Sequence, residues 1–379
     1  MIYGKLSGQL CFQIKSETSL LNISLALYNS AIVALIVAVT IRFFFHLDWP
    51  NEGLTLGTSQ KILVIAYLIH SAVCAVTTSV GQFWLNGILL DVQKYNESMQ
   101  TKRLGSSYAF MGHALWLLCL ILSMVHILTI IVIILGVVRL PFAPVFIPNA
   151  VWLDIINCFY IPNAISYSGA LFVILSAIVA AFIDDLNRDI REARAPHGSN
   201  LIRYFQCRYH KIYQLCTKID SLFSFQIFAV YTTYILVTLI CTYIMVKSSL
   251  VETSTIVIFA SWWGLMTSHL AMVTIPATIV YDKDQHLLDA AYDMFNSHKC
   301  RGTINFAEFN VFTSQLHDRP LAFTAAGFFN INRSLVLTLL SATVTYVIVL
   351  LQFDSSSSSA APFVAGGYNE TGMTPLFGA

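Results

Sequence analysis

The chain has 379 residues, of which 56% are hydrophobic and only 11% are charged. Because an ordinary soluble domain carries about 25% charged residues, this composition excludes such a domain and indicates an integral membrane protein. The formal net charge of +1 gives no indication of a nucleic-acid partner.

Seven apolar segments follow one another along the chain, each long enough to cross a ~30 Å hydrocarbon core as a helix. They span residues 21–45, 62–89, 109–138, 151–183, 223–246, 255–280 and 331–353. The N-terminal segment is polar and the first apolar run is too long for a cleavable signal peptide, so we expect the first span to be the anchor. The sequence therefore predicts an all-α polytopic membrane protein with seven transmembrane helices.

Basic residues are distributed unevenly between the predicted loops. Two lie in the N-terminal segment, three between the second and third spans, seven between the fourth and fifth, and five from Tyr281 to Arg333 at the start of the seventh span, which is 17 of the 21 in the chain. The positive-inside rule then places the N-terminus in the cytosol and the C-terminus outside. This orientation argues against a G-protein-coupled receptor, whose N-terminus is extracellular.

Two inner loops have a helical pattern of their own. Residues 200–222 alternate apolar and basic side chains, which predicts that the fourth and fifth spans continue into the cytosol as helices. Phe306, Phe309, Phe312 and Leu316 recur at three and four residues, which indicates a further amphipathic helix. We interpret these helices as a packed cytosolic bundle, with helices lying on the membrane surface as the alternative. Acidic residues end the neighbouring spans, and we interpret them as solvated helix ends: Asp184, Asp185, Asp282 and Asp284.

Signals of enzymatic chemistry are absent from the sequence. It contains no His-Glu-x-x-His, no Walker A sequence and no Gly-x-Ser-x-Gly, and His298 and Cys300 lack companions at metal-ligand spacing. We therefore expect no enzyme activity, no metal site and no cofactor.

Polar and aromatic residues gather in the outer halves of the predicted spans. Polarity inside a membrane costs free energy unless it is paired or hydrated, and a small-molecule site is mostly apolar with a few polar groups. Taken one at a time, these polar residues could instead form hydrogen bonds between helices. Together they predict an outward-facing ligand pocket bordered by His126, Asp154, Asn157, Tyr160, Tyr234, Trp262, Trp263 and Thr267.

The seventh span carries a narrow polar stripe. Ser341, Thr345 and Gln352 are separated by four and seven residues, so they share one face of the helix. Hydrogen bonding across a helix interface would explain such a stripe. The other explanation is that the stripes of several subunits face one another around a water-filled path.

The end of this span reads TYVIVLLQF, from Thr345 to Phe353. It resembles the signature that ends the seventh span of insect gustatory receptors, and the upstream run RPLAFTAAGFFNINRSLV is also similar to that family. The resemblance implies a tastant-gated, non-selective cation channel in the plasma membrane of sensory neurons. It implies a homotetramer, or a heteromer with other gustatory receptors, that binds a small-molecule tastant and membrane lipid. In that family the seventh spans line the pore, with Gln352 and Phe353 at the outer gate and Thr345 and Ser341 below them.

The predicted organisation has five parts. A cytosolic N-terminal segment (1–20) precedes spans one to six (21–280), cytosolic anchor helices (281–330), the pore-lining span (331–353) and a flexible extracellular tail (354–379). The sugar-receptor branch usually carries a Glu where this chain has Val347, so we expect a bitter or plant-derived organic compound. A fructose-type or internal nutrient receptor, a seven-span transporter and a chemoreceptor that is not a channel are the alternatives.

Overall fold

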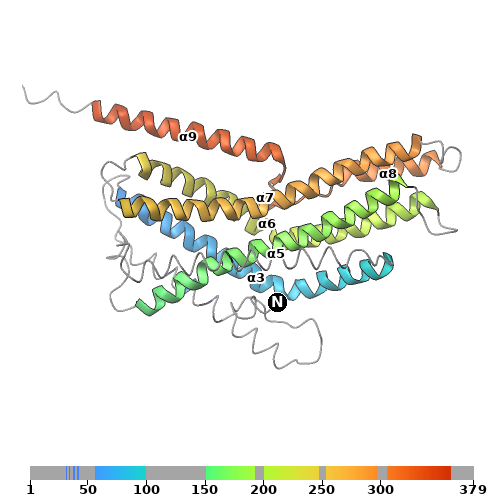
Figure 1. The fold of residues 1–379 in the computed structure, drawn as a ribbon, viewed down its shortest axis with the longest axis horizontal. Coiled ribbons are helices and arrows are strands. Elements are labelled where there is room, and N and C mark those ends of the chain that lie inside the picture. The colour runs from blue at the N-terminus through green and yellow to red at the C-terminus, as the bar shows by residue number, and fades with distance from the viewer. Residues whose placement is uncertain are drawn as a thin grey trace, which may run out of the picture.

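The computed structural model describes residues 56–99, 151–192, 200–246, 253–296 and 305–359, with isolated helical positions at 31, 34, 37, 38, 41 and 121. Four long helices, α3 (Leu56–Met99), α5 (Val151–Arg191), α6 (Leu201–Val246) and α7 (Thr253–Asn296), run along the molecule and pack on one another (Figure 1). At about 1.5 Å per residue each is roughly 60–70 Å long, about twice the ~30 Å hydrocarbon core. Each helix therefore extends well beyond one crossing.

These lengths confirm that the fourth and fifth spans continue as helices, because α5 runs to Arg191 and α6 already begins at Leu201. The same holds for α3 and α7, which pass the predicted span ends at residues 89 and 280 without a break. The predicted first and third spans, 21–45 and 109–138, lie outside the described residues apart from the isolated positions.

Helix α8 (Phe306–Asp318) is the predicted amphipathic helix of the inner loop, and it lies against the end of α7 (Figure 1). Asn305 caps its N-terminus by accepting a hydrogen bond from the Ala307 N–H at 3.0 Å. Phe309, Phe312 and Leu316 are buried, and the Phe309 ring stacks on Phe295 of α7 with centroids 4.3 Å apart. The predicted packing of this helix in a bundle is thus confirmed.

A short connection, residues 319–332, joins α8 to the last helix, and we call it the linker. It contains a small antiparallel hairpin of β1 (Thr324–Ala325) and β2 (Phe329–Asn330), in which Thr324 pairs with Asn330. The turn between them places Ala326 at φ 50° and Gly327 at φ 75°, a region that glycine tolerates best. The all-α prediction missed this hairpin, which is too short to show an alternating pattern.

Helix α9 (Arg333–Ser359) follows the linker and lies apart from the other labelled helices over most of its length (Figure 1). Asn332 caps it by accepting a hydrogen bond from the Leu335 N–H at 2.9 Å. The helix continues past Phe353 to Ser359, so the first residues of the predicted tail are helical.

Among the described residues, two helical stretches are long and apolar enough to cross a membrane, Ile165–Arg191 and Leu201–Tyr243. Two shorter apolar stretches are Ile65–Ser79 and Arg333–Val349. Large apolar side chains are exposed on the surface of the long helices, such as Phe225 of α6 and Ile275 of α7. Exposed apolar surface of this kind is typical of contact with lipid or another subunit.

Candidate functional site

The polar stripe of α9 faces away from its own helical bundle. Leu335 and Leu339 pack against the bundle core and Thr343 is buried. At about 100° per residue, Ser341, Thr345 and Gln352 fall on the opposite side of the helix, and all three are exposed. The structure therefore leaves the predicted stripe without a covering surface from its own described helices.

The stripe presents oxygen atoms outward. The Thr345 hydroxyl donates its proton to the Ser341 carbonyl oxygen at 2.9 Å, so its oxygen lone pairs stay available to water or a cation. Thr338 makes the same contact with the Ser334 carbonyl oxygen. The backbone of Gln352 and Phe353 lies in the helix, and the Phe353 side chain is outside the described part.

The linker is bound to α6 by a partly buried carboxylate. Asp220 accepts hydrogen bonds from the Thr324 N–H at 2.6 Å and from its hydroxyl at 2.8 Å. The Ala326 N–H donates to the Ser224 carbonyl oxygen at 2.9 Å. Phe323 of the linker is fully buried and contacts the Phe172 ring edge to face, with centroids 5.0 Å apart. These contacts hold the start of α9 against α5 and α6.

A second carboxylate fastens the linker to α7. Asp284 accepts a hydrogen bond from the Leu321 N–H at 2.9 Å. The Tyr209 hydroxyl of α6 lies 2.7 Å from the Arg319 carbonyl oxygen and 3.2 Å from Asp284, so it shares one proton between two acceptors. Burial, only partly offset by these hydrogen bonds, raises the pKa of Asp284 to about 6.

The interpretation of the acidic helix ends as solvated is wrong for two of the four residues. Asp284 is 3% exposed and Asp185 is 8% exposed, because α8, the linker and neighbouring helices cover the inner ends of α5 and α7. Asp184 and Asp282 are more exposed and pair with Lys283 and Arg333, respectively. The sequence does not show which helix ends are covered by other segments. A polar residue at a helix end therefore predicts exposure even where the folded chain buries it.

A buried arginine joins three of the inner helix ends. Arg208 of α6 is 3% exposed and pairs with Asp189 of α5. Its guanidinium also donates to the Tyr95 hydroxyl of α3 at 3.4 Å, where burial raises the tyrosine pKa to about 12. Arg208 therefore ties α3, α5 and α6 together beneath the predicted spans.

The structure describes part of the predicted ligand pocket. The Trp263 indole N–H donates to the Thr238 hydroxyl of α6 at 3.2 Å, and the Thr267 hydroxyl donates to the Trp263 carbonyl oxygen at 2.8 Å. Tyr234 is buried one turn from Thr238, in a cluster that includes Met266 of α7. Tyr234, Trp263 and Thr267 thus lie at or beside the contact between α6 and α7.

The remaining pocket residues are not placed by their side chains. Asp154, Asn157 and Tyr160 lie in α5 and Trp262 lies in α7, but the described part of the chain does not include their side chains. His126 lies outside the described residues altogether. A hollow of about 260 Å³ on the outer surface of α3, lined by Ile69, Val73, Val76 and Phe225 among others, includes none of the predicted pocket residues.

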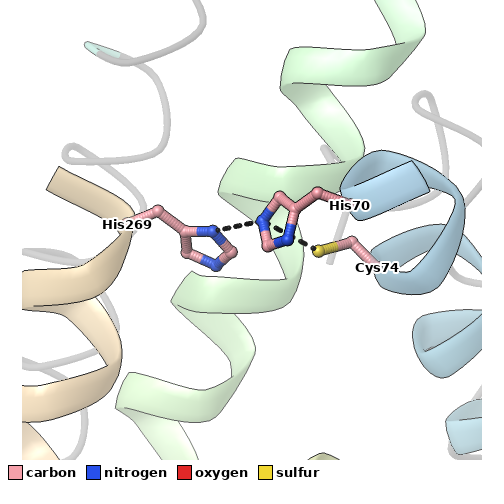
Figure 2. A group of neighbouring side chains, drawn as sticks. All are labelled: His70, Cys74 and His269. Atoms are coloured by element: carbon pink, nitrogen blue, oxygen red, sulfur yellow. Dashed lines mark hydrogen bonds between the residues drawn. The ribbon is translucent and has the colours of Figure 1, made fainter. Parts of the chain in front are cut away.

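Three side chains come together that the sequence did not connect. His70 and Cys74 of α3 meet His269 of α7 inside the bundle, and Figure 2 shows the two rings side by side with the sulfur next to His70. His70 Nε2 lies 3.0 Å from His269 Nδ1 and 3.7 Å from Cys74 Sγ. The four-residue spacing of His70 and Cys74 places both on one helix face and could have indicated part of this group. His269 lies at least 195 residues after them in the chain, so no local pattern connects it to them.

Comparisons with known proteins identify the fold and the family. A family model described as "7tm Chemosensory receptor" matches residues 1–357. The solved olfactory receptor OR5 from Machilis hrabei in complex with eugenol has a TM-score of 0.69 at 17% identity, over 93% of this chain and 96% of that chain. A second structure of that receptor, described without eugenol, has a TM-score of 0.70 at 16% identity. These likenesses show the shared fold.

Two relatives from Caenorhabditis elegans match part of the chain. Gustatory receptor family protein 3 is 27% identical over 236 residues, which are 58% of this chain and 52% of that protein. High-energy light unresponsive protein 1 is 23% identical over 171 residues, 44% of this chain and 39% of that protein. The matched region therefore spans about half the length of these relatives or less. Since the family model covers nearly the whole sequence, the chain belongs to the 7tm chemosensory receptor family.

Proposed function

We propose that this receptor is a tastant-gated, non-selective cation channel whose pore is lined by α9. The observation that carries the proposal is the exposed stripe of Ser341, Thr345 and Gln352, which lies opposite the face that α9 packs on its own bundle. Exposed hydroxyls on a predominantly apolar helical segment require water or polar partners inside a membrane. A shared aqueous pore supplies both.

A pore of this kind requires several copies of the chain, because one α9 cannot enclose water. We propose a homotetramer, or a heteromer with other gustatory receptors, in which the stripes face a common axis. The outward-pointing oxygen atoms of Ser341 and Thr345 would replace part of a cation's hydration shell, and their lack of charge fits weak selectivity among cations.

The gate in this proposal lies at Gln352 and Phe353. Adjacent residues on a helix point about 100° apart, so a modest rotation of α9 exchanges a water-excluding ring for a hydrogen-bonding amide. Gln352 already belongs to the exposed stripe. Closing would bring Phe353 toward the axis.

The ligand pocket in this proposal lies in the outer halves of the spans, at the residues predicted from the sequence. The contact between Trp263 and Thr238 gives it a polar border between α6 and α7. The Machilis hrabei receptor binds eugenol, and by analogy we propose a bitter or plant-derived organic compound. Such a ligand favours opening only to the extent that it binds the open state more tightly.

The linker couples the pocket to the gate in this proposal. It is held to α6 by Asp220 and to α7 by Asp284, so a relative movement of those helices reaches the first turn of α9. The Arg208 network keeps the inner helix ends fixed while the outer halves move. The cytosolic N-terminus, the five-part organisation and the location in sensory neurons belong to the same proposal.

Recording current from cells that express this chain alone tests the proposed function. The cells should have a low background conductance and receive a panel of plant alkaloids, glycosides and sugars, with Gln352→Ala and Phe353→Ala alongside the wild type. We expect a ligand-evoked cation current that either substitution alters. Surface-expressed protein that gives no current with any ligand, alone or with other gustatory receptors, would contradict the channel.

A further inference from the structure

The cluster of His70, Cys74 and His269 is buried completely inside the helical bundle. The three residues are 0%, 0% and 2% exposed, and one nitrogen or sulfur atom from each lies within 4.8 Å of the other two. Helices α3 and α7 supply them, and Figure 2 shows α5, on which both helices pack, passing beside the group. The proposed channel activity uses none of the three side chains.

The hydrogen bonding of the two rings is incomplete. Two neutral imidazoles carry two protons on four nitrogen atoms, and the contact between His70 Nε2 and His269 Nδ1 uses one of them. His70 Nδ1 and His269 Nε2 have no hydrogen-bond partner among the described residues. One of these outer nitrogens is then a bare lone pair and the other an unpaired N–H. Buried polar groups left in this way are rare. An ion bound between the two facing nitrogens would replace their contact and leave a proton on each outer nitrogen, so the facing nitrogen and sulfur atoms, and not the outer nitrogens, indicate an ion.

The geometry points to a metal ion held by His70 Nε2, His269 Nδ1 and Cys74 Sγ. With metal–nitrogen bonds of about 2.0 Å and a metal–sulfur bond of about 2.3 Å, a trigonal ion separates nitrogen from sulfur by about 3.8 Å and the two nitrogens by about 3.5 Å. The corresponding distances in the structure are 3.7 Å and 3.0 Å. The third pair of ligand atoms, from His269 and Cys74, lies within 4.8 Å, so a shift of the His269 ring by about 1 Å toward the sulfur completes the site.

Charge selects the ion. Cys74 must lose its thiol proton to bind a metal, and a monovalent ion that takes the place of this proton leaves the buried group neutral. A divalent ion would leave one uncompensated positive charge in a region of low dielectric constant. Zinc would also need a fourth ligand, whereas Cu(I) is selected by thiolate and accepted by imidazole. We propose that these three residues bind one Cu(I) ion, with release of the Cys74 proton to bulk water.

The surroundings of the cluster are shaped to its rings. Gly169 of α5 lies so close that a Cβ atom there would be 2.9 Å from His269 Cδ2 and 2.8 Å from Met272 Cε. A side chain at this position would displace the His269 ring, so the glycine makes room for it. A bound ion would join α3 to α7 across the bundle, and it would therefore stabilise the folded protein by mass action.

Metal binding by the purified full-length protein tests this proposal. Anaerobic protein is loaded with Cu(I), and in parallel with Ag(I) as a redox-inert monovalent ion, and then dialysed against the Cu(I) chelator bathocuproine disulfonate. We expect one Cu(I) per chain to be retained, X-ray absorption to show two nitrogen neighbours and one sulfur neighbour, and the melting temperature to rise.

Three variants separate this site from other thiols. Cys74→Ser and His269→Gln should each lose the retained ion. Cys241→Ser should keep it, because Cys241 is buried in the same apolar cluster as Cys74 but is not one of the three proposed ligands. Wild-type protein that retains no Cu(I), a sulfur-only absorption spectrum, or preferential retention of Zn²⁺ would overturn the proposal. The metal content and absorption spectrum of the wild-type protein test the proposal even if a variant misfolds. Neither measurement depends on channel activity.

Discussion

Replacing Tyr209 with phenylalanine removes one hydroxyl group from the contact between α6 and the linker. That hydroxyl is the donor to the Arg319 carbonyl oxygen at 2.7 Å and also approaches Asp284 at 3.2 Å, and the Tyr209 side chain is fully buried. A buried hydrogen bond of this kind contributes about 1–2 kcal/mol. The ring itself keeps its packing, so the loss is confined to the polar contact.

The expected result is a local loosening of the linker. A change of about 1–2 kcal/mol corresponds to a factor of about 5 to 30 in an equilibrium constant, so amide hydrogen exchange in residues 319–332 should accelerate by about that factor. Tyr213→Phe is the matched control, because it removes a hydroxyl one turn later on the same helix, where no contact with the linker is seen among the described residues. Exchange that is unchanged in Tyr209→Phe, or equally faster in Tyr213→Phe, would refute the role of this contact.

Three further substitutions test the linker and the pore. The pKa of Asp284 is raised to about 6 from its ordinary 3.8, so the stabilisation of the folded protein by its protonated form is fully present below about pH 4 and is lost as pH rises through 6. We expect the free energy of unfolding of the wild type to fall by up to about 3 kcal/mol over that range. Asp284→Asn should flatten this part of the profile of melting temperature against pH. A profile of the same steepness in both proteins would contradict this. Phe323→Ala should cost about 3–5 kcal/mol, because it empties a fully buried site against Phe172; an unchanged melting temperature would count against the packing. Thr345→Val should lower single-channel conductance by removing a pore-facing oxygen, while Val347→Thr, which adds one off the stripe, should not; equal conductances would argue against the assigned pore face.

Sequence patterns predicted the features that depend on periodicity. The stripe of Phe309, Phe312 and Leu316 correctly predicted α8 and its buried face. The alternation around Tyr213 correctly predicted that α6 begins far outside the apolar span. Both patterns are local, because each helix face repeats every three or four residues.

Features that depend on contacts between distant segments were not predicted. Asp284 was read as solvated, although the linker covers it from residue 321. The hairpin around Gly327 is stabilised by Asp220, more than 100 residues earlier in the chain. The pairing of His70 with His269 likewise depends on how α3 and α7 each pack on α5 and α6. No local pattern records such contacts, so the sequence could not reveal them.

The most direct test of the proposed pore is the chemical accessibility of α9 in an open channel. Thr345→Cys and Val347→Cys would be expressed separately, and a membrane-impermeant cationic thiol reagent applied while ligand holds the channel open. Thr345 belongs to the exposed stripe and Val347 points about 160° away from it on the helix. We predict rapid block of current in Thr345→Cys and a response like the wild type in Val347→Cys. Block of Val347→Cys alone, or of neither variant, would contradict a pore lined by this face of α9.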